Sequence, residues 1–327
     1  MWYIFILLFL LSTLLTFLVK NLALKKSVLD IPNERSSHLI PTPRGGGLAI
    51  AITWYLGLTY CAIIDIIEIK LFWALLSGLI LVCIGILDDL YNIKPIFRIL
   101  TQSLTVLIAL YFLDGLQAFE LGFTKFEYPI LLTIFAFVGI IWFINLFNFL
   151  DGIDGYASMQ AIYLSFVLFY FNTSNYYLIL VASVAGFLIW NWQPAKIFMG
   201  DVGSTLLGFN FGVFAVYEQN MDNLPIISFL ALSSLFWFDA TYTLFRRLLN
   251  REKLSQPHRK HAYQRIVRAG FSHKKTTLYG LGINLIILIS VVLCQNIILQ
   301  VTIPFILSLI LLYWITQWID KKTGFNN

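Results

Sequence analysis

The most distinctive polar stretch in the sequence is Asn145-Leu-Phe-Asn148-Phe-Leu-Asp151-Gly-Ile-Asp154-Gly. Its polar residues recur every three positions, so they would share one face of a continuing helix, and glycines interrupt the pattern at its end. Carboxylate and amide oxygens of this kind suit Mg²⁺, and Mn²⁺ would suit the same ligands, above all where substrate phosphates complete the shell. The alternative is a polar seam inside a helix bundle, which needs no metal.

Carboxylates also stand at two other places where apolar runs end or begin. Asp88 and Asp89 close one run, and Asp201 lies between two glycines just before another. Adjacent carboxylates repel each other unless a cation lies near, so this pair predicts a raised pKa or a metal contact. The alternatives are helix-terminal acids that face water for the pair, and a helix N-cap for Asp201.

Two segments carry the histidines that could bind an anion. His258-Arg-Lys-His261 lies in a strongly basic stretch, and such a cluster suits a polyanion such as pyrophosphate. A set of cations retained on the inner side of a membrane would explain the lysines and arginines but not the histidines. The other segment leads from His38 through Arg44 to Gly45-Gly46-Gly47. These glycines predict either backbone amides open to an anion or a close contact between helices.

Asp239 is an acid inside an apolar run. An ionisable residue in such a run is a functional candidate by default, because an isolated charge is costly in a membrane. We expect Arg246 or Arg247 to pair with it.

The elements that position these residues must be membrane helices. Apolar residues make up 59% of the chain and charged residues 12%, whereas soluble proteins average about half and about a quarter. One crossing of a bilayer takes roughly 20 apolar helical residues. We therefore expect an all-α polytopic membrane bundle of about eleven transmembrane helices, forming a single domain over residues 1–327. The apolar runs lie near 2–19, 47–64, 71–87, 98–113, 129–147, 156–172, 176–192, 204–217, 225–245, 276–294 and 299–318.

The basic residues predict which way this bundle faces. If the first helix starts outside, 20 of the 22 lysines and arginines fall on the inner side and only Lys70 and Lys125 fall outside. Because short inner loops retain Lys and Arg, the N-terminus is expected outside and the C-terminus inside. The candidate residues then lie on cytoplasmic segments 20–46, 88–98, 145–156, 191–204 and 246–276. The net charge of +5 fits attraction to anionic lipid and gives no reason to invoke nucleic acid.

Taken in order, these motifs resemble the polyprenyl-phosphate N-acetylhexosamine-1-phosphate transferases. The likeness runs through Asp30-Ile-Pro-Asn-Glu-Arg, Asp88-Asp89, Asn148-Phe-Leu-Asp-Gly-Ile-Asp-Gly, Phe198-Met-Gly-Asp-Val-Gly-Ser and the His258–Gln264 stretch. The resemblance implies transfer of a sugar 1-phosphate from a UDP-sugar to undecaprenyl phosphate, with release of UMP and a need for Mg²⁺. It also implies a bacterial inner membrane, with the active site facing the cytoplasm.

The resemblance assigns roles to individual positions. Asp201 is expected as the leading metal ligand, with Asp154 near the metal or nucleotide, and Asp88 as a base or lipid-phosphate contact beside Asp89. Asn148 and Asp151 would line the nucleotide pocket, Phe198 would stack on the uracil, and His258 and His261 would grip the pyrophosphate. The further residues expected to bind substrate are His38, Arg44, Lys94, Arg259 and Gln264.

The His258–Gln264 stretch bears on the donor sugar, and the arrangement of the acids bears on the alternative function. The form His258-Arg-Lys-His261-Ala-Tyr-Gln264 looks like the branch that starts O-antigen, or a related cell-surface glycan, with UDP-N-acetylfucosamine or UDP-N-acetylquinovosamine, which predicts a 6-deoxy sugar. The rival is a transporter or flippase. Transporters hold substrate near the membrane midplane between paired repeats, whereas here the acids gather at one interface and no paired halves are evident. The sequence leaves open a homodimer.

Overall fold

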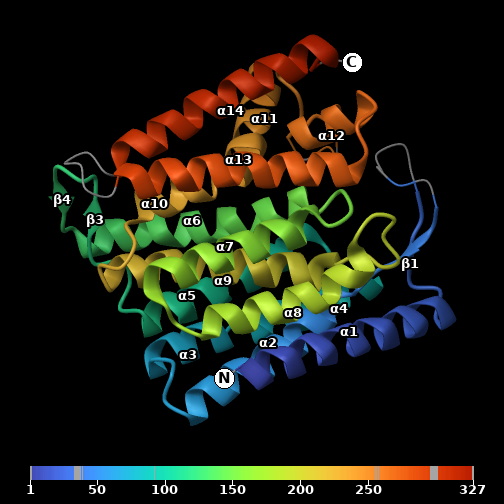
Figure 1. Ribbon diagram of the computed structural model, residues 1–327, viewed down its shortest axis with the longest axis horizontal. Coiled ribbons are helices and arrows are strands. Elements are labelled where there is room, and N and C mark those ends of the chain that lie inside the picture. Colours follow the sequence, from blue (N-terminus) through green and yellow to red (C-terminus); the bar gives the residue numbers. More distant parts are fainter. Residues whose placement is uncertain are drawn as a thin grey trace.

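The structure, a computed structural model, describes residues 2–32, 38, 40–91, 93–254, 256, 258–294 and 301–325. Part of the first motif, Asn33-Glu-Arg35, lies outside the described residues. The chain forms one layered bundle of roughly parallel helices (Figure 1). Its helices are α1 (Trp2–Lys25), α2 (Gly47–Ile63), α3 (Ile69–Leu76), α4 (Leu79–Tyr91), α5 (Pro95–Phe112), α6 (Pro129–Leu150), α7 (Tyr156–Asn172), α8 (Tyr176–Asn191), α9 (Gly200–Asn220), α10 (Ile226–Leu232), α11 (Ser234–Leu249), α12 (Ala262–Arg268), α13 (His273–Cys294) and α14 (Thr302–Lys322).

Two short antiparallel hairpins mark the opposite ends of the bundle. β1 (Leu29–Asp30) pairs with β2 (Thr42–Pro43), and β3 (Phe119–Glu120) pairs with β4 (Lys125–Phe126). The hairpin that contains β1 and the short helix α12 lie at one end, and the β3–β4 hairpin lies at the other (Figure 1). The candidate residues of all five segments belong to the end that carries α12.

The expectation of an all-α polytopic membrane bundle is confirmed. Over the described residues, each of the eleven apolar runs falls mainly on helical structure. Within the described chain, six helices are long and apolar enough to cross a membrane, or seven if α10 and α11 form one crossing. α2 and α8 are shorter apolar helices. The number of crossings and the orientation of the bundle stay predictions.

The run at 225–245 is broken rather than straight. α10 and α11 meet at an angle of 81°, with the buried Ser233 between them. Carbonyls near a break need new partners in an apolar setting. Trp237 Nε1 donates to the Leu230 carbonyl at 2.7 Å, and Ser233 Oγ donates to the Phe229 carbonyl at 2.7 Å. The bend lets α11 contact α12, α13 and α14.

α9 is the central helix, and α2, α4 and α6 pack against it. A Cβ added to Gly47 would lie 2.2 Å from the Gly203 nitrogen, and one added to Gly85 would lie 2.8 Å from the Val202 Cα. Small residues of this kind let membrane helices approach backbone to backbone. The start of α2 and the end of α4 therefore converge on the start of α9, where Asp201 lies.

The triple glycine serves this contact. The amides of Gly46 and Gly47 donate to the carbonyls of Phe198 and Met199, at 2.9 and 2.8 Å. These two amides are consequently unavailable to an anion. The expectation of an open anion-binding turn is wrong for them, because the close approach of α2 and α9 uses their hydrogen bonds.

Candidate active site

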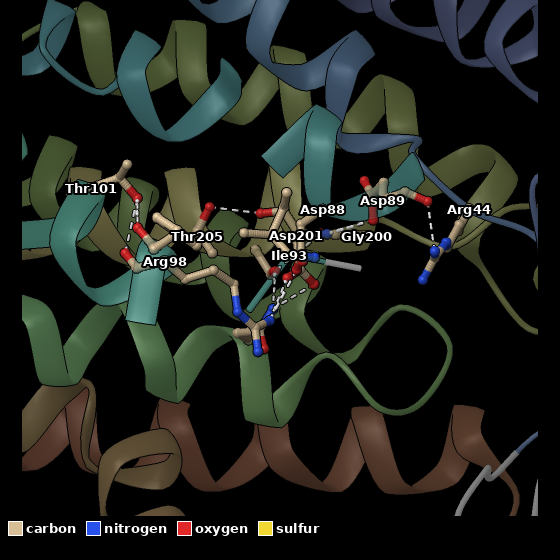
Figure 2. Close-up of polar contacts among 12 residues, drawn as sticks. Arg44, Asp88, Asp89, Ile93, Arg98, Thr101, Gly200, Asp201 and Thr205 are labelled. Carbon is tan, nitrogen blue, oxygen red and sulfur yellow. Dashed lines mark hydrogen bonds and ion pairs between the residues drawn. The ribbon is translucent and has the colours of Figure 1, made fainter. Parts of the chain in front are cut away.

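The centre of the site is a pair of carboxylates from two helices that share one cation. Arg98 of α5 lies between them: its Nη1 is 2.9 Å from Asp88 Oδ2 and 3.1 Å from Asp201 Oδ2 (Figure 2). The Asp88 side chain is 10% exposed and that of Asp201 is 26% exposed, so both carboxylates are shielded but reachable. Residues far apart in the sequence thus place two acids within reach of the same positive charge.

Asp89 turns away from this pair and holds the backbone instead. Its Oδ1 accepts the Asp201 amide at 3.2 Å, and its own carbonyl accepts Arg44 Nη2 at 2.6 Å (Figure 2). Gly200 makes this possible, because its φ is +74° and a Cβ there would lie 2.6 Å from Asp89 Oδ2. Only glycine adopts that conformation readily while leaving the space free. Asp89 therefore positions Asp201. The adjacent acids Asp88 and Asp89 thus have different tasks.

Asn148, at the end of α6, completes the centre. Its Nδ2 donates to Asp201 Oδ1 at 2.9 Å and to Ser204 Oγ at 3.1 Å. Asn145, one turn earlier, donates instead to Gln102 Oε1 and to the Ile141 carbonyl. The three-residue spacing therefore brings Asn148 to the site, whereas Asn145 forms part of a polar helix contact.

Asp151 directly follows α6 and faces the same space. It is half-buried. Burial, reinforced by the carboxylates of Asp201, Asp89 and Asp154, raises the pKa of Asp151 well above its usual range. Several acids around one space repel each other unless a cation enters. The site therefore favours a bound cation.

Asp154 is held by a histidine and a backbone amide. Its Oδ1 lies 3.2 Å from His273 Nδ1, and its Oδ2 accepts the Ala195 amide at 3.0 Å. His273 is the first residue of α13, so this contact joins the 145–156 segment to another helix. Both carboxylate oxygens have partners, and the role of Asp154 as a metal ligand stays a prediction.

Most of these groups line a polar cavity of about 470 Å³, whereas Asp88 and Arg98 are not on its wall. Among the sequence-predicted residues it brings together His38, Arg44 and Gln264 with the acids. His38 and Phe198 meet edge to face, with ring centroids 4.8 Å apart. The lining residues are Asp30, His38, Arg44, Asp89, Asn148, Asp151, Gly152, Ile153, Asp154, Asn191, Phe198, Gly200, Asp201, Ser204, Gln264 and His273.

The residues present fit a Mg²⁺ ion. Asp88 and Asp201 already point oxygens at one positive group, and Mg²⁺ is usually held by one or two carboxylates with phosphates and water. In the described ranges no three His, Cys, Asp or Glu side chains converge as a metal site. An ion at Asp201 would therefore take most of its ligands from substrate and solvent.

The 246–276 segment is organised around Asp239. The two Asp239 carboxylate oxygens accept the amides of Ala262 at 2.8 Å and Tyr263 at 3.3 Å, and Oδ1 lies 3.7 Å from His261 Nδ1. A carboxylate at the first amides of a helix satisfies donors that have no partner within the helix. Asp239 therefore holds the start of α12, and His261 with it.

The expectation that Arg246 or Arg247 pairs with Asp239 is wrong. Arg246 pairs with Asp320 of α14 at 2.9 Å, and Arg247 pairs with Glu252 at 3.0 Å. The amides at the start of α12 take the place that the arginines were expected to fill.

His258, His261 and Arg259 of this segment, and Lys94 of the 88–98 segment, do not line the cavity. The ring centroids of His258 and His261 are 4.9 Å apart. Burial, with His261 and Arg247 nearby, lowers the pKa of His258 to about 4. A neutral imidazole at pH 7 offers a hydrogen bond but no charge. Arg259 is half-buried, and Lys94 is exposed at the N-cap of α5; neither lines the cavity.

Tyr263 links this segment to the 145–156 segment. Its Oη donates to the Phe149 carbonyl at 3.0 Å. A Cβ added to Gly152 would lie 2.1 Å from Tyr263 Oη. These two segments, which carry half of the predicted site residues, are therefore in direct contact.

Three residues of the site were missed from the sequence. Arg98 was interpreted only as a charge that sets the orientation of the bundle. Its position one turn into the helix that follows Asp88-Asp89 could have indicated a partner for these acids. His273 was noted only as one of four histidines, and its place at a helix start beside two lysines distinguishes it. Asn191 accepts the Gly155 amide at 3.1 Å and donates to the Ile197 carbonyl at 3.0 Å, and nothing in its sequence context indicates this.

Comparison with known proteins supports the predicted resemblance to the polyprenyl-phosphate N-acetylhexosamine-1-phosphate transferases. The model of glycosyl transferase family 4 matches residues 71–219. A Bacillus subtilis protein named as a probable undecaprenyl-phosphate N-acetylglucosaminyl 1-phosphate transferase is 30% identical over 96% of this chain and 89% of its own length.

Two enterobacterial proteins, each named undecaprenyl-phosphate alpha-N-acetylglucosaminyl 1-phosphate transferase, show the same likeness. The Yersinia pestis protein is 29% identical over 87% of this chain and 82% of its own length. The Escherichia coli K12 protein is 27% identical over 82% and 76%. The chain therefore belongs to the polyprenyl-phosphate hexosamine-1-phosphate transferases of glycosyl transferase family 4.

Proposed function

We propose that the protein transfers an N-acetylhexosamine 1-phosphate from a UDP-sugar to undecaprenyl phosphate, releases UMP and needs Mg²⁺. The observation that carries this proposal is the pair Asp88 and Asp201, held around Arg98 beside a polar cavity. Phosphoryl transfer needs positioning and neutralised charge more than covalent chemistry by the protein. Acids that converge on one cation, next to arginine and histidine side chains, supply both.

The reaction joins the lipid phosphate to the phosphorus that carries the sugar. An oxygen of undecaprenyl phosphate attacks that phosphorus, and the bond from it to the oxygen bridging the two UDP phosphates breaks, so that UMP leaves. Bound Mg²⁺ would neutralise charge on the diphosphate. Arg98 adds a second positive group at the same place, and Asn148 and Asp89 hold Asp201 in position. Asp201 leads as the residue that would hold the metal, with Asp88 beside it.

Asp88 orients the reactants in this scheme rather than removing a proton. The second pKa of a phosphate monoester is about 6, so the acceptor is already mostly dianionic at pH 7. Asp88 is in addition fixed by Arg98 and by the Ile93 amide. A carboxylate bound in this way serves better to hold a cation than to accept a proton.

The site is proposed to face the cytoplasm of a bacterial inner membrane. The basic 246–276 segment contacts the 145–156 segment through Tyr263, so the acids lie at the same end of the bundle as the ten lysines and arginines of that segment. Retention of basic residues on the inner side supports this orientation.

The donor sugar is the least constrained part of the proposal. The three relatives named above carry N-acetylglucosaminyl in their names, which supports UDP-N-acetylglucosamine as the first donor to test. The 6-deoxy donors expected from the His258–Gln264 stretch stay a prediction, and so does a role in O-antigen synthesis. Rates with UDP-N-acetylglucosamine and with its 6-deoxy analogues decide between them.

One experiment separates the transferase from a transporter. Purified protein is given labelled UDP-N-acetylhexosamine and undecaprenyl phosphate, and UMP release is measured with Mg²⁺ and with a chelator. Asp201→Asn should lower the rate by more than about 100-fold, because it removes a charge at the reacting centre. Asp222→Asn is the matched control, since Asp222 is an exposed acid just past the other end of α9. Solute movement into sealed vesicles without UMP release would overturn the proposal.

A further inference from the structure

The end of α14 lies against the helix that brings the basic segment to the site. α14 runs along the outside of the bundle, and its C-terminal end approaches α12 (Figure 1). Asp320, Thr323 and Phe325 make the contacts, and we call these three residues the C-terminal clasp. Phe325 is only 7% exposed although it lies close to the end of the described chain. A phenylalanine buried at that position indicates a specific docking contact.

The clasp binds Arg265, a residue of α12 that is 1% exposed. Asp320 forms an ion pair with Arg265 and another, at 2.9 Å, with Arg246. Arg265 Nη1 also donates to the Thr323 carbonyl at 3.1 Å, and Thr323 Oγ1 donates to the Arg265 carbonyl at 3.1 Å. A buried arginine needs this level of pairing, because an unpaired buried charge is costly.

Phe325 closes the clasp with its aromatic face. Three cations surround its ring: Arg246 at 3.9 Å, Lys260 at 5.0 Å and Arg265 at 5.5 Å from the ring centroid. Cations attracted to an aromatic face are held more strongly when they are removed from water. Lys260 lies next to His261, so the ring contacts the basic segment on both sides of the start of α12.

Three consecutive residues of α12 connect the clasp to the site. Arg265 contacts the clasp, Gln264 lines the polar cavity, and Tyr263 Oη donates to the carbonyl of Phe149, next to Asn148. A shift of α12 would therefore move a cavity residue and a support of the 145–156 segment together. Nothing in the proposed chemistry assigns a task to α14.

We infer that Asp320, Thr323 and Phe325 are positioning residues of the active site, which fix α12 so that Gln264 and Tyr263 keep the cavity in shape for the UDP-sugar. This inference rests on the proposed function. None of the three clasp residues lines the cavity. Its loss should weaken donor binding more than it slows the chemical step.

The test compares Phe325→Leu, which keeps the apolar contact but removes the aromatic face, with Phe325→Tyr, which keeps both. Lys321→Ala is the matched control, because Lys321 is exposed and follows the clasp residue Asp320 directly in α14. We expect Phe325→Leu to raise KM for the UDP-sugar by about 3- to 10-fold, with kcat within about twofold, the range that loss of a desolvated cation–π contact predicts. Phe325→Tyr and Lys321→Ala should match the wild type.

Amide hydrogen exchange gives a readout that does not need activity. Exchange in α12 should be faster in Phe325→Leu, while the unfolding temperature and exchange in α9 stay unchanged. Unchanged exchange in α12, or an equal KM for all four proteins, would overturn the inference. If the wild type releases no UMP, the proposed function fails, and the exchange comparison still decides whether the clasp holds α12.

Discussion

The contact between α2 and α9 predicts that Gly47→Ala damages the site from a distance. Gly47 packs on Gly203, in the turn that follows Asp201. A Cβ at this position would lie 2.2 Å from the Gly203 nitrogen, 2.4 Å from the Gly203 Cα and 3.0 Å from the Met199 carbonyl. All three atoms belong to the backbone, so no side chain can rotate away.

The size of the effect follows from these distances. Ordinary contacts begin near 3.4 Å, so the shortfall from 3.4 to 2.2 Å is about 1.2 Å. The two helices must separate by an amount of that order, and overpacking of this kind costs about 1–3 kcal/mol or more. The hydrogen bond from Gly47 to Met199 would lengthen as well. A displacement of about 1 Å at catalytic groups can cost about 100-fold in rate.

The assay measures UMP release and the unfolding temperature of the purified variant. Gly282→Ala is the matched control, since a Cβ at this position of α13 meets nothing within 4 Å. Because alanine favours a helix over glycine by about 1 kcal/mol, the control should keep or slightly exceed wild-type stability. A Gly47→Ala protein with wild-type rate and unfolding temperature would refute the reasoning, because the backbone contact at the start of α9 could not then exist.

Two further predictions concern charge. Arg98→Ala leaves Asp88 and Asp201 without their shared cation, so the rate of UMP release should fall by about 100-fold or more. Arg98→Lys should retain a larger share of the wild-type rate. Equal rates for Arg98→Ala and wild type would contradict the proposed role of Arg98 in the site. Asp151→Asn tests the raised pKa of Asp151. A carboxyl whose pKa is higher in the folded state stabilises the protein at low pH, and that contribution is lost as pH rises from about 4. In metal-free buffer the wild-type unfolding temperature should therefore fall more between pH 5 and 8 than that of Asp151→Asn, and parallel curves would show that Asp151 ionises freely.

The sequence was enough to predict the helical class and the composition of most of the site. Apolar runs locate membrane helices, because each membrane-crossing segment must form its backbone hydrogen bonds internally. Acids at the ends of these apolar runs are easily recognised. Asp88, Asp201 and Asn148 were identified in this way, and the structure brings them together. Their separation in the chain did not matter, because the C-terminal ends of α4 and α6, which carry Asp88 and Asn148, meet the N-terminal end of α9, which carries Asp201.

Pairings between segments were harder to predict. Asp239 was matched to arginines by charge, whereas the structure satisfies it mainly with the backbone amides of α12, which no sequence pattern displays. Arg98 was read as an orientation signal, since a basic residue near a membrane helix end is common for that reason alone. The bend at Ser233 has no proline or glycine to indicate it. Each of these features depends on a partner from another segment.

The contact between Gly152 and Tyr263 sets a rule for how relatives of this chain can diverge. A side chain at 152 would occupy the place of the Tyr263 hydroxyl, so the two positions must be compatible although they are 111 positions apart in the sequence. A relative with a larger residue at the first position should carry a shorter one at the second, because residues in contact vary together. Substitutions in the His258–Gln264 stretch are then confined to those that leave this pair compatible.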